Sequence, residues 1–406
     1  PIRYLAGVLM CLQMLLGPTF AYNGLNEYQF ETYKMKIPEA EYFSYVMPAV
    51  IMFILGLHVT AGKLKGEVLN VASIRLFIDR SGKLPYIFIA IGFVSSLVSI
   101  FFSSALVFVF YLLSSFKFIG VFMLICGTRQ LKPWVLVLVY GSIISSSLAE
   151  AMFHDLLTWL IMLGAVLAIK YKPPVILKTA TTIGFVVLVI IIQQVKGEYR
   201  KKTWGGAGGD FEAFENVLTS KKESNSLFSF ESLADHNVRI NQGFIVTNIM
   251  STVPERVPYA NGEELMQILE AAFMPRVFSP DKLKAGDRTL FMKYSGMTLQ
   301  KGTSMGLSSV GDGYINFGPI GGCFFMFFWG LLFSEVLKGF HNISRFYPVL
   351  LLFTPMVFYY PIRPDCELQT SLGHLVKSCM LIAGMFLIWK HNFIRVKRRV
   401  GIKPVQ

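Results

Sequence analysis

Long apolar segments recur along most of the chain and alternate with shorter polar loops. The segments are continuously apolar, without the alternation that marks a barrel strand, and a helix needs about 20 such residues to span a bilayer. Inside lipid a helix satisfies its own backbone polar groups. The pattern predicts ten spanning helices, near Tyr4–Ala21, Tyr42–Ala61, Leu84–Phe102, Ala105–Cys126, Pro133–Ala149, Leu156–Ile169, Ile176–Gln193, Tyr314–Leu337, Tyr347–Tyr360 and Ser371–Trp389.

One long polar segment interrupts this rhythm, from about residue 196 to residue 310. Its first part is rich in glycine and serine and is predicted to be mobile. The periodicity of Ser229–Met250 predicts an amphipathic helix. Glu263–Phe273 is predicted as a second helix, with Asn261 as its N-cap and Pro275 just beyond its end.

The distribution of basic residues sets the predicted orientation. Lysine and arginine gather in alternate short loops and in the C-terminal tail, which all fall on one side if ten helices span. That side is cytoplasmic by the positive-inside rule. We therefore predict an all-α polytopic membrane protein with one large, partly helical periplasmic loop between helices 7 and 8. Its regions are helices 1–7 in residues 1–195, the loop in 196–313, helices 8–10 in 314–390 and a basic cytoplasmic tail in 391–406.

Composition supports the membrane class and argues against a nucleic-acid partner. Hydrophobic residues make up 53% of the chain and charged residues only 16%, whereas soluble domains carry about 25% charged residues. The net charge of +13 comes from the loops between apolar segments, where cytoplasmic lysine and arginine are expected. The five cysteines are scattered without metal-ligand spacing.

Two motifs and the layout carry a family resemblance. The motifs are PRVFSPDK, from Pro275 to Lys282, and GDGYINFG, from Gly311 to Gly318. With ten helices and a large late outer loop, the chain resembles the bacterial O-antigen polymerase-like family of oligosaccharide repeat-unit polymerases. The resemblance implies a membrane glycosyltransferase of the inner membrane whose active site faces the periplasm. It would transfer a growing glycan from undecaprenyl pyrophosphate to the next lipid-linked repeat unit.

The resemblance also implies partners in lipopolysaccharide or related polysaccharide biosynthesis. These are the undecaprenyl-pyrophosphate-linked oligosaccharides, membrane lipid, and a chain-length regulator and a flippase of the same pathway. No cofactor and no metal site are predicted.

The implied reaction needs cations for the pyrophosphate and a base or orienting acceptor for the acceptor hydroxyl. The candidate cations in the loop are Arg239, Arg256, Arg276, Lys282 and Arg288. The candidate bases are Asp235, His236 and Asp312. Several have a structural alternative. Asp235 and Arg239 have the spacing of a surface ion pair, and Arg276 and Lys282 have the alternative of ordinary solvated charges. Asp312 has the place of a cap on the eighth helix. Tyr314 and Asn316 are candidates for glycan contact or for anchoring at the membrane interface.

A second group of ionisable residues lies at the outer ends of the last two predicted helices. It comprises Arg363, Asp365, Glu367, His374 and Lys377. Ionisable groups in spanning segments are costly and indicate function, so Arg363, His374 and Lys377 are further candidates for pyrophosphate binding. The alternative is a solvated ion network.

Two further features have both a functional and a structural interpretation. Glu150, His154 and Asp155, between helices 5 and 6, either line a cavity or cap helix ends. Lys117, in the middle of helix 4, either pairs within the bundle or marks a shifted boundary.

Other functions remain open at the level of sequence. An O-antigen ligase differs from a polymerase only in its acceptor. A transporter or flippase for the same lipid is expected to show repeated halves and broken helices, and the sequence pattern shows neither. A membrane scaffold without catalytic activity is the remaining alternative.

Overall fold

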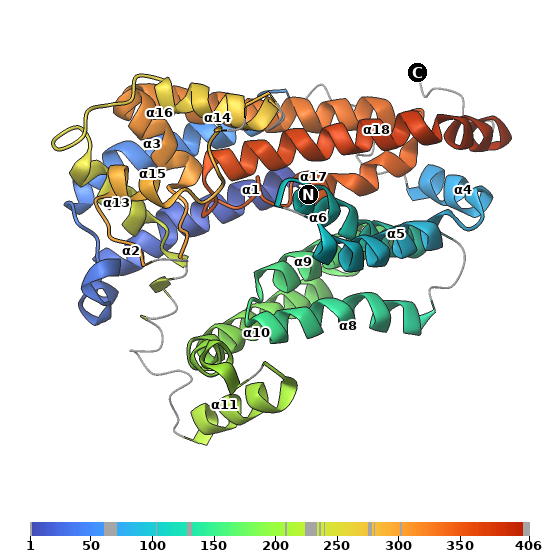
Figure 1. Ribbon diagram of the computed structural model, residues 1–406, viewed down its shortest axis with the longest axis horizontal. Helices are drawn as coiled ribbons and strands as arrows, with labels where there is room; N and C mark the ends of the chain where they lie inside the picture. Colours follow the sequence, from blue (N-terminus) through green and yellow to red (C-terminus); the bar gives the residue numbers. More distant parts are fainter. Residues whose placement is uncertain are drawn as a thin grey trace. The chain divides into compact units, whose positions relative to one another are not determined.

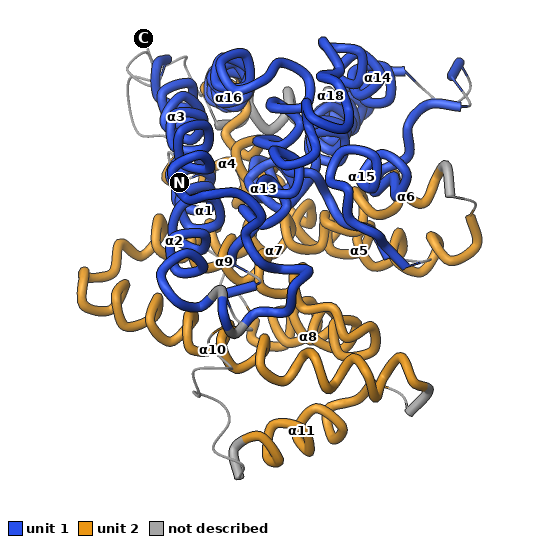
Figure 2. The backbone as a smooth tube through the Cα atoms, turned by 90° about the vertical axis from the view of Figure 1, so that its left-hand side faces the viewer, with its two compact units in different colours: residues 1–68, 237–342, 354–388 blue, residues 69–236, 343–353, 389–406 orange. Residues whose placement is uncertain are grey.

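The chain forms two compact units (Figure 2). The computed structural model describes residues 2–60, 71–102, 104–127, 132–207, 209–223, 234, 237–238, 240–274, 278–279, 281–300 and 303–400. Unit 1 comprises Pro1–Val68, Asn237–Asn342 and Thr354–Ile388, and unit 2 comprises Leu69–His236, Ile343–Phe353 and Trp389–Gln406. The segment predicted as a single outer loop, 196–313, is therefore divided between the units at His236.

Helices form the regular structure of the described residues, and nine of them are long and apolar enough to cross a membrane (Figure 1). They are Ile2–Tyr22, Glu39–Val59, Leu84–Phe101, Leu106–Cys126, Pro133–Glu150, His154–Tyr171, Val175–Gly205, Ser308–Ser344 and Leu368–Trp389. Each coincides with a predicted span, which confirms the all-α, multi-pass class of membrane protein.

The prediction of a tenth long helix near Tyr347–Tyr360 is wrong. This segment holds a short 3-10 helix, η8 (Pro348–Phe353), and a single turn of helix, α17 (Thr354–Val357). Both begin at or beside a proline, Pro348 and Pro355. Proline has no N–H for the helical ladder, so an apolar run of sufficient length does not become one continuous helix here.

Unit 1 is built on three helical segments that cross in close contact. The first is α1 (Ile2–Cys11) with the π-helix η1 (Leu12–Leu16) and α2 (Gly17–Tyr22). The others are α3 (Glu39–Val59) and α16 (Ser308–Ser344). A Cβ placed on Gly330 of α16 would lie 2.2 Å from the carbonyl oxygen of Phe53 in α3. Glycine therefore lets the two backbones touch, as small residues do between membrane helices.

Hydrogen bonds distinguish two ends of this bundle. At the first, the "Arg3 end", Arg3 Nη2 donates to Ser334 Oγ (3.1 Å), and Thr60 Oγ1 lies 2.6 Å from the same oxygen. At the second, the "Tyr45 end", the Tyr45 hydroxyl donates to the carbonyl of Val310 (2.6 Å). The candidate site described below lies toward the Tyr45 end.

The helix α16 is a hairpin rather than one straight span. Gly318 has φ 66° and ψ −171°, and Pro319 follows it, so the helical ladder breaks there. In a straight helix, Gly313 and Gly322 would be about 14 Å apart. Instead, a Cβ on Gly322 would lie 3.1 Å from the carbonyl carbon of Gly313. Residues 308–317 therefore fold back against the first turns of residues 319–344, and the predicted eighth helix, Tyr314–Leu337, begins inside the shorter arm.

Three further helices of unit 1 precede the hairpin: α13 (Gly243–Thr252), α14 (Glu263–Phe273) and α15 (Arg288–Ser295). The prediction of α14 is confirmed at both ends. The prediction of an amphipathic helix over Ser229–Met250 is wrong for its described C-terminal part, because every residue of α13 except Ser251 is buried. Buried neighbours on all sides, not one apolar face, hold this helix in place.

Unit 2 contains the helices α4 (Val71–Ser81), α5 (Leu84–Val98), α6 (Ser104–Ser114), α7 (Phe116–Cys126), α8 (Pro133–Glu150), α9 (His154–Tyr171), α10 (Val175–Lys202) and α11 (Phe211–Glu223). The first part of the large polar loop was predicted to be mobile. Instead, the end of α10 and the whole of α11 are helical there. Lys117 lies in α7, where Nζ donates to Ser142 Oγ (3.3 Å) and sits 5.2 Å from the ring centre of Phe93. Lys117 therefore pairs within the bundle.

Candidate functional site

The start of α18 (Leu368–Val400) is capped by a carboxylate from α16. The backbone N–H of Leu368 donates to Asp312 Oδ2 over 2.8 Å, and Asp312 is only 4% exposed. Asp312 was predicted either as a base or as the cap of its own helix. The second alternative is wrong, since Asp312 lies within α16 and caps the following long helix. A buried helix start needs such an acceptor, because its first N–H groups have no partner within the helix.

Glu367, the residue just before α18, also accepts hydrogen bonds at this helix start. Its Oε1 accepts hydrogen bonds from the N–H of Gly286 (2.5 Å) and from Thr370 Oγ1 (2.8 Å). Burial raises the pKa of this carboxyl above its ordinary value. Gly306 packs against the same turn, since a Cβ there would lie 2.8 Å from the Glu367 nitrogen. Two loop segments distant in sequence therefore converge on the first turn of α18.

Arg363 lies four residues before Glu367 and pairs with Asp365. Its Nη2 donates to Asp365 Oδ2 (2.8 Å) and its Nε to Oδ1 (3.4 Å). The guanidinium also lies 5.5 Å from the ring centre of Tyr360. Its remaining nitrogen, Nη1, is buried without a hydrogen-bond partner in the described part of the chain. Arg363 thus retains donor capacity beyond its ion pair.

His374 is engaged in the fold. The residue is 2% exposed, and Nε2 lies 2.7 Å from the carbonyl oxygen of Met356 in α17, so Nε2 carries the proton at this contact. Its ring lies 5.0 Å from that of Tyr360. His374 and Arg363 therefore flank the same tyrosine, as the prediction of a joint cluster requires. Lys377 lies one turn further along α18. Its Nζ is 3.7 Å from the point where a Cβ added to Gly373 would lie.

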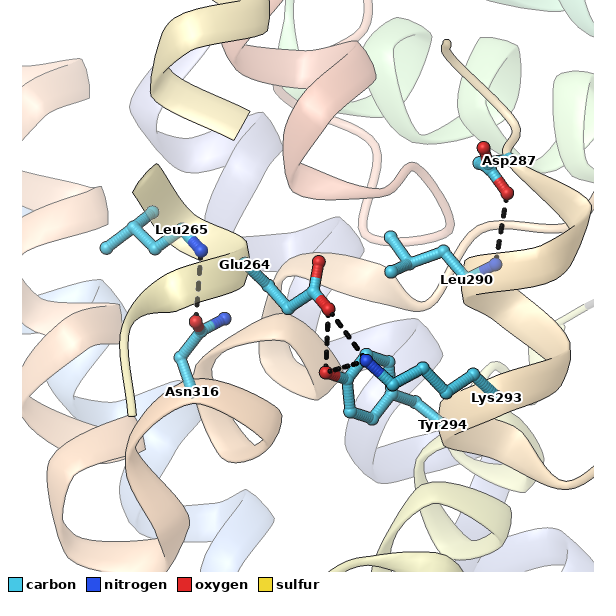
Figure 3. Close-up of polar contacts among 7 residues, drawn as sticks. All are labelled: Glu264, Leu265, Asp287, Leu290, Lys293, Tyr294 and Asn316. Atoms are coloured by element: carbon cyan, nitrogen blue, oxygen red, sulfur yellow. Dashed lines mark hydrogen bonds and ion pairs between the residues drawn. The ribbon is translucent and has the colours of Figure 1, made fainter. Parts of the chain in front are cut away.

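Sequence reasoning missed a third carboxylate, Glu264, in the first turn of α14 (Figure 3). Its Oε1 accepts hydrogen bonds from the Tyr294 hydroxyl (2.7 Å) and from Lys293 Nζ (3.1 Å), both on α15. Its Oε2 is buried without a hydrogen-bond partner among the described residues. The partners lie about 30 positions away in sequence, so no local spacing reveals the group. Asp312 interacts electrostatically with both Glu367 and Glu264. We call these three residues the carboxylate cluster.

Asn316 connects α16 with α14, the helix that carries Glu264. Its Oδ1 accepts from the N–H of Leu265 (3.0 Å; Figure 3). Its Nδ2 donates to the carbonyl of Asp312 (2.9 Å). The prediction of Asn261 as N-cap of α14 is wrong: the cap position is Gly262, and the side chain that caps the helix comes from α16. Asn316 is 2% exposed and therefore has a positioning role rather than a place at the membrane interface.

The other aromatic candidate, Tyr314, is also internal. It is 7% exposed, and its ring packs edge-on against those of Tyr45 (5.0 Å) and Tyr259 (5.8 Å). The prediction of an interface anchor is wrong for Tyr314, because its ring is enclosed by protein.

The described loop cations bind mainly to backbone carbonyls. Lys282 Nζ donates to the carbonyls of Ala271 and Met274 at the end of α14. Its positive charge there is favourable, because the C-terminal end of a helix dipole is negative. Arg288 Nε donates to the carbonyl of Leu299 (2.7 Å). Arg256 is exposed. The remaining loop candidates, Asp235, His236, Arg239 and Arg276, lie outside the described residues.

A separate group joins α8 to α9 in unit 2. His154 Nε2 lies 2.6 Å from Asp155 Oδ1, and the carbonyl of Glu150 accepts from Trp204 Nε1 (3.2 Å). We call Glu150, His154 and Asp155 the connection cluster. These residues lie at the end of one helix and the start of the next, but the cap positions are Ala151 for α8 and Phe153 for α9. The prediction that their side chains cap the helix ends is therefore wrong.

Taken together, the nine apolar helices and the ionisable groups toward one end of unit 1 define a multi-pass membrane protein with a charged site at a buried helix terminus. The chain belongs to the family described as a domain of unknown function, DUF8712, whose model matches residues 27–343. That match includes α3 and α16 but ends before Arg363. No curated protein matches the chain. No solved structure matches it either. Among the described residues, no group of three histidine, cysteine, aspartate or glutamate side chains is arranged to hold a metal ion.

Proposed function

We propose that the protein polymerises undecaprenyl-pyrophosphate-linked oligosaccharide repeat units at the outer face of a bacterial inner membrane. The observation that carries the proposal is that unit 1 contains both a cation and buried carboxylates toward one end. Arg363, whose Nη1 has no hydrogen-bond partner among the described residues, and the buried carboxylate cluster occur toward the same end of one helical bundle. Transfer from a pyrophosphate needs a cation for the leaving group and a carboxylate for the acceptor hydroxyl.

The distribution of charge supports the orientation. Arg3 and Lys338 lie toward the Arg3 end of the unit 1 bundle. By the positive-inside rule this end is cytoplasmic. The Tyr45 end, with the carboxylate cluster, is then periplasmic.

In the proposed reaction, Arg363 binds the donor pyrophosphate. Arginine suits this task because its planar guanidinium donates to two phosphate oxygens at once. The acceptor hydroxyl oxygen forms a bond to the anomeric carbon of the donor sugar. The bond from that carbon to the pyrophosphate oxygen breaks, and its electron pair leaves with the pyrophosphate. The hydroxyl proton passes to a carboxylate.

A second candidate function is transport of the same lipid-linked glycans. The break in α16 at Gly318 is the observation that favours it, since discontinuous helices are common at transporter binding sites. The break falls inside the segment predicted as one continuous eighth helix, Tyr314–Leu337. A ligase remains the enzymatic alternative, because it would use the same donor with a lipid A core as acceptor.

Gene deletion followed by complementation tests the proposal. Loss of the polysaccharide ladder, with single repeat units still displayed at the surface, marks a polymerase. Polymer retained on the carrier lipid marks a ligase, and repeat units retained inside the cell mark a transporter. Unchanged glycans would overturn all three functions.

Two arginine variants test the site within the same strain. Arg363→Ala is expected to restore less than about 1% of polymer synthesis, since lost electrostatic stabilisation of a leaving group costs about 100-fold or more. Arg345→Ala is the matched control because Arg345 is exposed and lies just after the end of α16. Full complementation by Arg363→Ala at equal expression would exclude Arg363 from the site.

A further inference from the structure

We propose that Glu264 is the residue that accepts the proton of the acceptor hydroxyl, with Tyr294 and Lys293 as its positioning residues. This inference rests on the proposed function and adds the base, which neither sequence motif contains. It is drawn from the contacts of Glu264 (Figure 3). The side chain of Glu264 is 10% exposed, yet only one of its two oxygens is hydrogen-bonded within the described part of the chain.

The two carboxylate oxygens of Glu264 have different surroundings. Oε1 receives two donors, the Tyr294 hydroxyl and Lys293 Nζ, and Lys293 in turn donates to the Tyr294 oxygen over 2.9 Å. Oε2 lies buried without a partner among the described residues. A buried polar atom without a partner is costly to the fold. An arrangement of this kind, with one oxygen held by a second and third residue and the other left open, is typical of an oriented base.

The remaining members of the carboxylate cluster are occupied with the fold. Asp312 Oδ2 caps Leu368, and Glu367 Oε1 accepts from Gly286 and Thr370 at the same helix start. Removing either carboxylate would leave backbone donors unsatisfied. Glu264 instead receives its hydrogen bonds from two side chains.

The frame around Glu264 is fixed from three elements. In its own helix, α14, Leu265 donates its N–H to Asn316 Oδ1 of α16 (3.0 Å). Ala260, which precedes α14, donates its N–H to the Ile315 carbonyl of α16 (2.9 Å). On α15, the hydrogen bond to Tyr294 raises the pKa of Lys293 above its ordinary value, so Lys293 stays charged beside Glu264.

The chemical step balances with Glu264 as base. The acceptor O–H bond breaks and its proton binds Oε2. The acceptor oxygen bonds to the anomeric carbon as the pyrophosphate departs with the electron pair of its bond. The proton then leaves Glu264 for solvent or for the pyrophosphate product. Lys293, whose side chain is 49% exposed, holds Oε1 in place during the step.

The test uses the full-length protein in lipid nanodiscs, with lipid-linked repeat units extracted from the deletion strain. Glu264→Gln is expected to lower the initial rate of polymer formation about 100-fold or more, since general-base catalysis contributes about 10²–10⁴-fold. Glu263→Gln is the matched control, because Glu263 is the neighbouring residue of the same helical turn and is exposed. Glu264→Asp keeps the charge and is expected to retain more activity than Glu264→Gln, which guards against loss of folding as the explanation.

The split between kcat and KM separates a base from a purely structural carboxylate. The charged and titratable groups facing Glu264 are Lys293 and Tyr294 on α15 and Asp312 on α16. Tyr294→Phe and Lys293→Met each remove one donor to Glu264 Oε1. At equal amounts of folded protein, each is expected to lower kcat with KM unchanged, whereas a purely structural role would leave kcat per folded protein unchanged.

The outcomes distinguish this inference from the function on which it rests. Polymer formation by Glu264→Gln at the wild-type rate, or a wild-type kcat in Tyr294→Phe at equal amounts of folded protein, would overturn the role of Glu264 and leave the polymerase intact. Absence of polymer from the wild-type protein, with no glycan change on deletion, would overturn both.

Discussion

The carboxylate cluster of unit 1 and the connection cluster of unit 2 have similar compositions but different environments. In the first, Glu264 has a side chain that is 10% exposed, and Asp312 bonds to a residue 56 positions away. In the second, His154 has a side chain that is 39% exposed and pairs with its immediate neighbour. Buried charges are costly unless satisfied, whereas exposed pairs contribute little. The comparison teaches that burial and long-range partners, not the presence of charge, distinguish the cluster that we propose to be functional.

Substitution of Asp312 is expected to have the largest effect on stability. Asp312→Ala removes the acceptor of Leu368 N–H, and a lost cap costs about 0.5–2 kcal/mol while a buried unsatisfied donor costs about 1–3 kcal/mol. The apparent Tm in detergent should therefore fall clearly. Asp312→Asn keeps an acceptor oxygen, so its apparent Tm should fall less. Equal apparent Tm values for Asp312→Ala and wild type would show that the carboxylate cluster contributes no more to stability than the connection cluster does.

Asn316 offers the next largest effect and connects stability to activity. Asn316→Ala removes the side-chain cap of α14, and we expect a loss of about 1 kcal/mol. Because α14 carries Glu264, polymer synthesis should fall by more than the loss of stability explains. Comparing rates at equal amounts of folded protein measures this. Asn316→Asp retains the acceptor oxygen and should preserve the cap; if both variants show wild-type rates, the α14–α16 tie does not position Glu264.

Hydropathy sufficed to predict nine spans, because a bilayer-length apolar run is a local property. Glu263–Phe273 was also predictable, since its acidic first turn and the following Pro275 lie within one short window. The return segment at Pro348–Val357 was not, because hydropathy does not register how proline interrupts the helical ladder. The Gly318-Pro319 pair is a breaker signal within the motif, but only tertiary contacts show that the chain folds back there.

The site was predicted in part. The proposed cation Arg363 and the buried Asp312 were among the predicted residues, since an ionisable group near an apolar segment stands out in any sequence. The role of Asp312 was not predictable, because it depends on Leu368. Glu264 was missed since acidic residues are common in the first turn of a helix, and its partners on α15 are brought near only by folding.

A smaller effect is expected from the pH response of Glu367, the residue just before the last span. Its raised pKa means that the folded state favours the protonated form. The resulting stabilisation is fully present below the unfolded pKa of about 4.5 and is lost as the pH rises through the folded pKa. A tenfold difference in proton affinity between the folded and unfolded states corresponds to about 1.4 kcal/mol. Apparent Tm of the wild type should therefore decline over this interval relative to Glu367→Gln. Parallel curves for the two proteins would contradict a desolvated Glu367.

The smallest effect is expected in the connection cluster, where a double-mutant cycle gives the sharpest measurement. His154→Ala and Asp155→Asn, singly and together, should reveal a coupling of about 0.2–1 kcal/mol, the range of exposed ion pairs. Neither variant should change polymer synthesis, because these side chains sit at the junction of two helices and are more than a third exposed. Thermal unfolding in detergent and glycan display together provide both readouts. A coupling above about 2 kcal/mol, or loss of polymer at normal stability, would show that the connection cluster is as important as the carboxylate cluster. Burial would then not distinguish the two clusters.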